Sequence, residues 1–262
     1  MKTTIDTQTD ELLCHVEDGV GVITLNRPNA RNALSMQLTP AMRRMIPLLA
    51  GDEAIRCIVV TGAGDAFCAG GDVKSMASSD DGPKRSAGER IETLKAGQAT
   101  LTGALWAVTK PTLAALPGPA AGAGLALALA CDMRIAAQSA FVTTGYRNIG
   151  LSGDYGITWF LTALLGPSKA CELLYLADRI SADRCLELGV VNMVVPDDQF
   201  RDEVMALARR LAAGPPNALC CMKAHVRRAM TLPLGECLDA EAEALIELSD
   251  GEEFRTTVRS FV

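Results

Sequence analysis

Short apolar strands alternate with helical segments over the first 195 residues, and this alternation constrains the fold more than any other feature. Residues 19–25 (GVGVITL) alternate and are rich in β-branched side chains, which is typical of a strand. The runs 55–61 and 111–116 are short and apolar on both faces, as in a buried sheet. Residues 120–131 are apolar all round and predict a fully buried helix. The pattern therefore favours an α/β core.

The end of the chain differs from this core, because it has helical spacing and no strand signal. We therefore divide the chain into an α/β core at residues 1–196 and a C-terminal helical region at residues 197–262. The helices expected in the second part span residues 200–211, 217–230 and 236–248.

Composition and charge exclude several classes of protein. The net charge is −6, and Lys and Arg are spread along the chain, so no basic block marks a nucleic-acid interface. The longest apolar run, residues 120–131, is shorter than the roughly 20 residues of a membrane span. The first ten residues are polar and slightly acidic, unlike a signal peptide. Nine cysteines have no metal-type spacing, so we expect a cytoplasmic protein with reduced thiols and no membrane or nucleic-acid partner.

The chain has only two histidines, His15 and His225. We place His15 in a polar segment before the first strand and His225 on a helix, and we expect both to be solvated. A His-dependent catalytic triad and a His-rich metal site are therefore not expected, and we predict no metal.

Two glycine-containing stretches follow predicted strands. Residues 66–72 (AFCAGGD), the first glycine loop, come after the strand at 55–61. Residues 118–124 (GPAAGAG), the second glycine loop, lead into the apolar helix and lack the G-x-G-x-x-G spacing of a dinucleotide site. Small residues let backbone N–H groups approach a ligand, and such donors can hold a developing oxyanion. The structural alternatives are a tight turn in the first loop and close helix packing in the second.

Asp154 is the third candidate, in the segment IGLSGDYG at residues 149–156 ahead of a predicted helix. Desolvation in a cavity lined by small residues would raise its pKa toward that of a useful base. The alternative is an N-cap, a position that aspartate favours. Cys68 lies beside the first glycine loop without a histidine near it in sequence, and a buried cysteine usually acts as a small hydrophobe.

Taken together, these stretches resemble the crotonase family, also called enoyl-CoA hydratases/isomerases, over nearly the whole chain. The resemblance implies a spiral of ββα units and a C-terminal helical region used in trimers, which often stack as hexamers. It implies an acyl-CoA thioester substrate, in which coenzyme A enters as part of the substrate and no separate cofactor is needed. The matching motifs are Leu25-Asn26-Arg27-Pro28, Val60-Thr61-Gly62, Leu165-Gly166 and residues 66–72, 118–132 and 149–156.

The resemblance also implies roles for particular residues. In the family, a thioester carbonyl lies between two backbone N–H groups that stabilise an enolate, and by position these belong to Gly71 and Ala123. Removing one such donor typically costs roughly 3 kcal/mol of transition-state stabilisation. Family substrates place their CoA moiety near the first turn and the first glycine loop. The positions implied here are Asn29, Ala30, Arg31, Ala69, Asp72 and Lys74.

The chain departs from the family pattern at the two glutamates with which hydratases activate water. The first falls on Ala126 and the second on Tyr146, so hydration is poorly supported. Asp154 matches the single Asp or Glu of several family isomerases, in which one carboxylate takes a proton and returns it. We therefore expect a CoA-thioester double-bond isomerase with Asp154 as acid/base, and with Tyr146, Cys68 and Ala126 at the substrate.

Three alternatives stay open at this point. A hydratase or lyase could hold water with Asp154 and Tyr146. Some family dehalogenases use an Asp at this position as a nucleophile toward a halogenated aroyl-CoA, with an aromatic residue at the position of Tyr146. A CoA-binding subunit that has lost its acids would need neither role. In each case we expect a mobile loop at residues 78–89 and the helix from Ile91 to shape the acyl pocket.

Overall fold

The computed structural model describes residues 2–72 and 86–259, which contain two β-sheets. The larger sheet has the order β1-β2-β3-β4-β5-β7-β10, and the smaller has the order β6-β8-β9. Strands β1 to β3 pair antiparallel, whereas the pairs from β3 to β10 are parallel. The larger sheet comprises β1 (Lys2–Ile5), β2 (Leu12–Glu17), β3 (Val20–Leu25), β4 (Cys57–Gly62), β5 (Thr112–Leu116), β7 (Met133–Ala137) and β10 (Met193–Val195). The smaller comprises β6 (Ala120–Ala121), β8 (Phe141–Thr143) and β9 (Ile180–Ser181).

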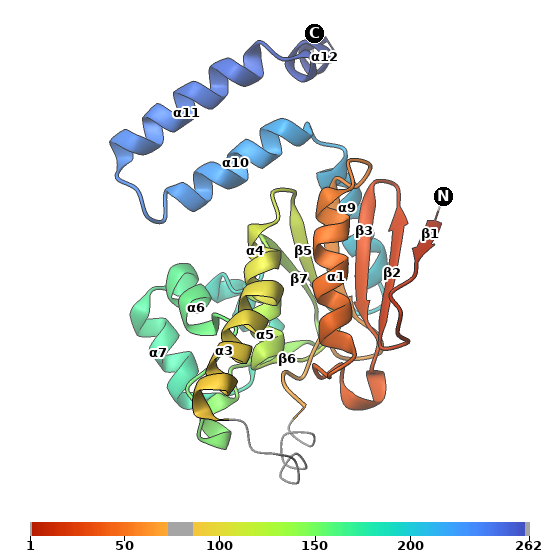
Figure 1. Cartoon of the computed structure of the whole chain (residues 1–262), viewed down its shortest axis with the longest axis vertical. Helices are drawn as coiled ribbons and strands as arrows, with labels where there is room; N and C mark the ends of the chain where they lie inside the picture. The colour runs from red at the N-terminus through yellow and green to blue at the C-terminus, as the bar shows by residue number, and fades with distance from the viewer. Residues whose placement is uncertain (1, 73–85, 260–262) are drawn as a thin grey trace.

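Helices cover the larger sheet and continue beyond one end of it (Figure 1). Within the described residues, no helix is both long and apolar enough to cross a bilayer. The helices of the α/β part are α1 (Leu38–Gly51), α3 (Ala87–Gln98), α4 (Ala104–Ala107), α5 (Ala123–Leu129), α6 (Ile157–Leu165), α7 (Pro167–Leu176) and α8 (Ala182–Leu188), with the short 3-10 helices η1 (Pro28–Ala30) and η4 (Tyr146–Ile149). The C-terminal helices are α9 (Phe200–Ala212), α10 (Pro216–Arg228), α11 (Leu234–Ser249) and α12 (Glu252–Arg259).

Strand β4 shows why the larger sheet is apolar on both faces. Ile58 and Val60 belong to the core that contains α1, whereas Cys57 and Val59 belong to a second core that contains α9. Figure 1 shows α1 and α9 on opposite sides of the strands. Successive side chains of a strand point to opposite faces, so a strand covered on both sides must be apolar throughout. This arrangement confirms the predicted α/β core.

The N-terminal strands correct one expectation. The strand predicted at residues 19–25 is β3, and two further strands precede it. His15 therefore lies within β2, not ahead of the sheet, and it is half-buried. Burial lowers the pKa of His15. In β2, Leu12 and Cys14 face the core, whereas Leu13 is exposed, so the strand lacks the clean alternation of apolar and polar residues that marks a strand with one solvated face.

The helix predicted at residues 120–131 begins instead with a strand. Ala120 and Ala121 form β6, Gly122 turns the chain at φ 52, and α5 starts at Ala123. Every residue in this segment is small or apolar, so periodicity gave no sign of the turn.

The helical segment that starts at α3 contains a π-helical turn, Ala99–Gly103, before it continues as α4. Ser86 caps α3 and forms a capping box with Glu89. Residues 86–89, which were expected in a mobile loop, therefore begin this helix. The rest of that predicted loop, residues 78–85, lies outside the described residues.

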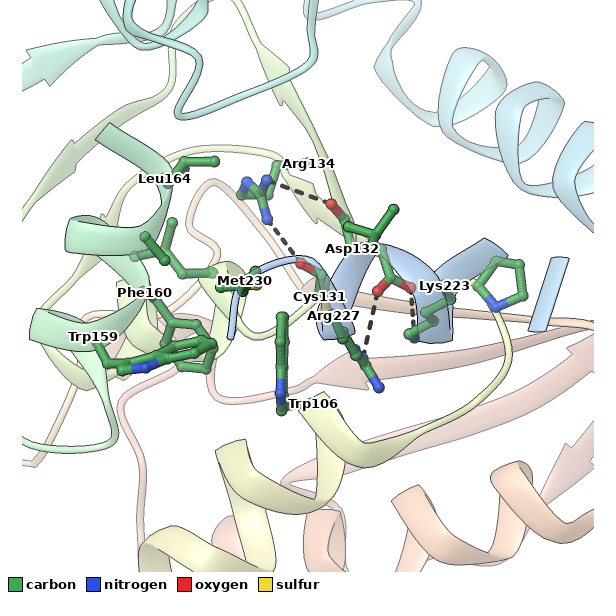
Figure 2. Close-up of a pocket in the computed structure, with 14 residues that line it drawn as sticks. Trp106, Cys131, Asp132, Arg134, Trp159, Phe160, Leu164, Lys223, Arg227 and Met230 are labelled. Atoms are coloured by element: carbon green, nitrogen blue, oxygen red, sulfur yellow. Dashed lines mark hydrogen bonds and ion pairs between the residues drawn. The ribbon is translucent and has the colours of Figure 1, made fainter. Parts of the chain in front are cut away.

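Helix α10 is attached to the core by charged and aromatic contacts. Lys223 Nζ donates to Asp132 Oδ2 at 2.6 Å, and the Arg227 guanidinium lies 4.3 Å from the centre of the Trp106 ring (Figure 2). A cavity of about 440 Å³ lies beside these contacts and is bounded on the α6 side by Trp159. Helices α10 and α11 lie beyond one end of the sheet (Figure 1), and both were predicted, whereas α12 was not.

Candidate active site

The two glycine loops lie against each other. The Ala121 N–H donates to the Cys68 carbonyl at 2.9 Å, and the Phe67 N–H donates to the Pro119 carbonyl at 3.0 Å. Gly70 has φ 91, and a Cβ there would lie 2.8 Å from the Ala121 oxygen. Glycine is therefore required for this close approach of two backbones.

Two backbone amides at this meeting point are candidates for an oxyanion hole. Gly71 follows Gly70, and Ala123 is the first residue of α5. A Cβ built on Gly70 would lie 3.3 Å from the Ala123 nitrogen, so the loops bring this amide next to the first loop. Neither the Gly71 nor the Ala123 amide donates a hydrogen bond to any residue in the two described ranges. Both donors are therefore available to an oxygen with developing negative charge.

Asp154 is held by a hydrogen bond from a buried tyrosine. The Tyr146 hydroxyl donates to Asp154 Oδ1 at 2.5 Å, and Tyr146 is 9% exposed. Burial raises the pKa of Asp154, and the Tyr146 hydrogen bond lowers it in part. The N-cap of α6 is Gly156, and Asp154 contributes only its backbone carbonyl to the Ile157 N–H. The N-cap interpretation of Asp154 is therefore wrong.

Tyr146 also connects Asp154 with the second glycine loop. A Cβ on Gly122 would lie 3.7 Å from Tyr146 Cζ, the ring carbon that bears the hydroxyl. The Gly122 N–H donates to the Thr143 carbonyl at 3.1 Å, which ties the loop to β8. The Asp154 carboxyl and the segment that leads into Ala123 therefore share one neighbouring side chain.

The positions predicted to bind CoA in the first turn lie beside the first glycine loop. Asn29 and Ala30 are in η1, and Arg31 follows with a left-handed φ of 47. The Ala69 N–H donates to the Arg31 carbonyl at 2.9 Å. These four residues, far apart in sequence, are thus brought together, while their contact with CoA stays a prediction.

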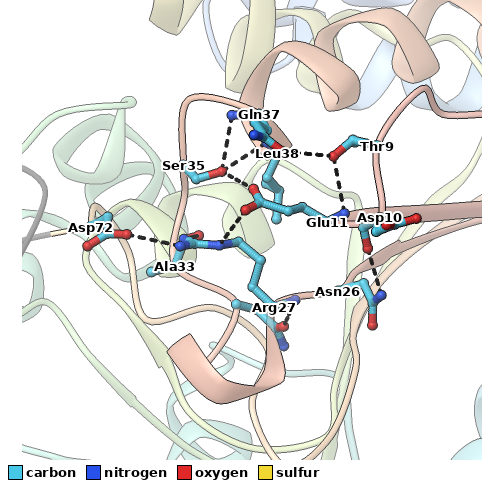
Figure 3. Close-up of polar contacts among 11 residues, drawn as sticks. Thr9, Asp10, Glu11, Asn26, Arg27, Ala33, Ser35, Gln37, Leu38 and Asp72 are labelled. Carbon is cyan, nitrogen blue, oxygen red and sulfur yellow. Dashed lines mark hydrogen bonds and ion pairs between the residues drawn. The ribbon is translucent and has the colours of Figure 1, made fainter.

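Asp72 forms an ion pair that its own sequence segment does not predict. Arg27 Nη2 lies 3.1 Å from Asp72 Oδ2, and Arg27 Nε lies 3.2 Å from Glu11 Oε1 (Figure 3). Glu11 in turn accepts a hydrogen bond from the Ser35 hydroxyl. Arg27 was visible only as part of the N-R-P turn, because its partner is 45 residues away. The role of Asp72 toward CoA stays a prediction, and Lys74 lies outside the described residues.

Cys68 and Ala126, which were predicted to lie at the substrate, are both fully buried. Burial raises the pKa of the Cys68 thiol to about 12, so this thiol is protonated at neutral pH and unsuited to act as a nucleophile. Ala126 lies within α5 and supplies no acid or base. Of the three predicted substrate-binding residues, only Tyr146 donates a hydrogen bond to Asp154.

Comparison with known proteins identifies the family of this chain. A family model described as enoyl-CoA hydratase/isomerase matches residues 15–262. The chain is 34% identical to 1,2-epoxyphenylacetyl-CoA isomerase of Escherichia coli K12, over 96% of this chain and 95% of that protein. It is 31% identical to 4-chlorobenzoyl coenzyme A dehalogenase-2 of Arthrobacter sp., over 87% of this chain and 82% of that protein.

Solved structures give the same result. The crystal structure of enoyl-CoA hydratase subunit I from Geobacillus kaustophilus HTA426 matches with a TM-score of 0.87 and 35% identity, over 96% of this chain and 94% of that one. The predicted fold class is thereby confirmed. By its sequence and by its fold, the chain belongs to the crotonase, or enoyl-CoA hydratase/isomerase, family.

Proposed function

We propose that this chain is a CoA-thioester double-bond isomerase in which Asp154 is both base and acid. The main support is the half-buried Asp154 carboxyl, which accepts a hydrogen bond from Tyr146, whose ring lies beside the second glycine loop. At the positions where family hydratases have glutamates, this chain has Ala126 and Tyr146, so no second carboxylate stands there to activate water. The similarity to a CoA-thioester isomerase is consistent with this reading.

In the proposed reaction, the Gly71 and Ala123 amides donate to the thioester oxygen. Asp154 removes a proton from the carbon next to the thioester, and the resulting dienolate places its charge on that oxygen. The same carboxyl then returns a proton to the γ carbon, and the double bond moves by one position. Each amide donor stabilises the transition state by roughly 3 kcal/mol. We propose that the CoA moiety contacts Asn29, Ala30, Arg31, Ala69, Asp72 and Lys74.

Turnover of 3-enoyl-CoA thioesters in deuterated water tests this proposal. We expect an isomer of the substrate that carries deuterium at the α or γ carbon. Mass spectrometry measures the added deuterium. A product heavier by one water would favour hydration instead. Binding of acyl-CoA with no exchange on any thioester tested would favour an inactive CoA-binding subunit.

The Tyr146→Phe variant tests the electrostatic part of the site. Loss of the hydroxyl removes the hydrogen bond that lowers the pKa of Asp154, so this pKa should rise further. Asp154 must be ionised to accept a proton, so the acidic limb of the kcat/KM profile should move to higher pH. Tyr175→Phe removes the hydroxyl of an exposed tyrosine on α7 and is the control, which should leave the limb in place. An unchanged limb in Tyr146→Phe, or a move to lower pH, would contradict this account.

A second candidate is nucleophilic hydrolysis by Asp154. It is favoured by the aromatic residue Tyr146 beside the carboxyl and by the similarity to a 4-chlorobenzoyl coenzyme A dehalogenase. In this reaction Asp154 attacks the ring carbon that bears the halogen, the halide leaves, and water then cleaves the aryl ester. Intact-mass measurement during turnover separates the two candidates, because only the nucleophile forms a covalent adduct.

We also propose that α10 to α12 join three copies of the chain, with trimers able to pair as hexamers. Helix α9 packs on the sheet, so within residues 197–262 the surface left for assembly belongs to the later helices. Exposed apolar side chains on these helices include Val226, Leu238, Leu245, Ile246 and Phe254. Large exposed apolar surfaces mark protein interfaces. Light scattering that finds a single chain in solution would exclude the assembly.

We propose a cytoplasmic location for the protein. All nine cysteines are free, which supports this proposal.

A further inference from the structure

The turn that carries Asp154 has an unusual backbone. Tyr155, the next residue, has a left-handed φ of 52, and the glycines at 153 and 156 have φ values of 118 and 81. Left-handed backbone is uncommon for a residue with a large side chain and persists only where the surroundings enforce it. Some contact outside the turn must therefore hold Tyr155 in this conformation.

Gln98 supplies that contact from another element. The Tyr155 N–H donates to Gln98 Oε1 at 2.7 Å, across 57 residues of sequence. Gln98 is the last residue of α3 and comes directly before the π-helical turn Ala99–Gly103. π-helical turns are rare and concentrate at functional sites, because the extra residue changes which side chains face a neighbour.

The same end of α3 receives a second clamp. Arg43 Nη2, from α1, donates to the Gly97 carbonyl at 3.2 Å, and a Cβ on Gly97 would lie 2.8 Å from that nitrogen. The positive charge of Arg43 also acts on the Tyr155 hydroxyl and partly offsets the burial that raises the pKa of this group. Arg43 thus holds the end of α3, while Gln98 holds the Tyr155 backbone.

We propose that Gln98 is a positioning residue for Asp154. By accepting the Tyr155 N–H, it stabilises the left-handed turn and keeps the neighbouring carboxyl against Tyr146. The proposal rests on the proposed function for its catalytic consequence, but the positioning itself does not depend on the reaction.

Two variants of similar size separate positioning from packing. Gln98→Met removes the acceptor, whereas Gln98→Glu keeps an oxygen that can accept the Tyr155 N–H. We expect Gln98→Met to lower kcat at least tenfold with KM for the acyl-CoA within twofold of wild type and with an unchanged melting temperature. Gln98→Glu should restore kcat to within about threefold. Equal losses in both variants, or wild-type kcat in Gln98→Met, would overturn the proposal.

A readout without turnover distinguishes failure of this proposal from failure of the proposed function. The titration of the Asp154 carboxyl can be followed by carbon NMR in the full-length protein. In Gln98→Met the carboxyl should be released toward water, so its raised pKa should fall toward the ordinary value for aspartate; in Gln98→Glu it should not fall. If wild type exchanges no acyl protons but this difference appears, the proposed function fails and the positioning stands. An unchanged titration in Gln98→Met overturns the positioning, whatever the activity.

Discussion

Asp154→Asn should lose the exchange of acyl protons with solvent, by a factor of roughly 10²–10⁴, which is the usual contribution of a positioned acid/base. The amide oxygen of Asn can still accept the Tyr146 hydroxyl, so the local structure is retained. The amide cannot take a proton at any pH near neutrality, so both proton transfers fail. The measurement is deuterium uptake from deuterated water, together with the rate of isomer formation.

The control for this variant is its affinity for the acyl-CoA, which should stay close to that of wild type, because Asp154 is assigned no contact with CoA. An unchanged melting temperature would show that the turn is intact. Full deuterium exchange in Asp154→Asn would remove this carboxyl from the mechanism. A covalent adduct on wild-type Asp154 during turnover would favour the nucleophilic alternative.

Ala123→Pro should lower kcat by about 10²–10³-fold, because proline removes the N–H proposed to bind the enolate oxygen. The substitution suits the fold, since Ala123 is the first residue of α5 and proline is favoured at that position. The preceding residue, Gly122, has φ 52 and ψ −124, outside the α region that a following proline disfavours. The loss should therefore report the missing donor and not an unfolded helix.

Ala123→Gly is the matched control, because it changes the side chain and keeps the N–H. It should retain kcat within a few fold of wild type. Steady-state kinetics of both variants on the same thioester, with melting temperatures beside them, decide the question. Wild-type kcat in Ala123→Pro would exclude this amide from the oxyanion hole.

The parts of the fold that could be predicted from sequence are those in which a local pattern reports burial. Strand β4 lies between two helical layers and is apolar on both faces, so its run of apolar residues was sufficient. Strand β2 exposes Leu13 on its outer face, so it has no clean alternation of apolar and polar residues from which to predict it. The two-residue strand β6 had no pattern of its own inside an apolar segment.

The candidate site also has parts that the sequence predicts and parts that it does not. The two glycine loops and Asp154 were predicted because small residues and an isolated carboxylate stand out along the chain. The bond of Gln98 to Tyr155 and the ion pair of Arg27 with Asp72 could not be found, because the partners lie 57 and 45 residues away in sequence. Only the fold brings such pairs together.

The bond between Tyr146 and Asp154 has a stereochemical consequence. Tyr146 occupies Oδ1 of the carboxyl, and within the described residues no donor reaches Oδ2. If one oxygen on one side of the substrate both removes and returns the proton, the transfer must be suprafacial. The hydrogen lost from the α carbon and the hydrogen gained at the γ carbon would then lie on the same face of the planar dienolate, and chirally labelled thioesters would reveal that face.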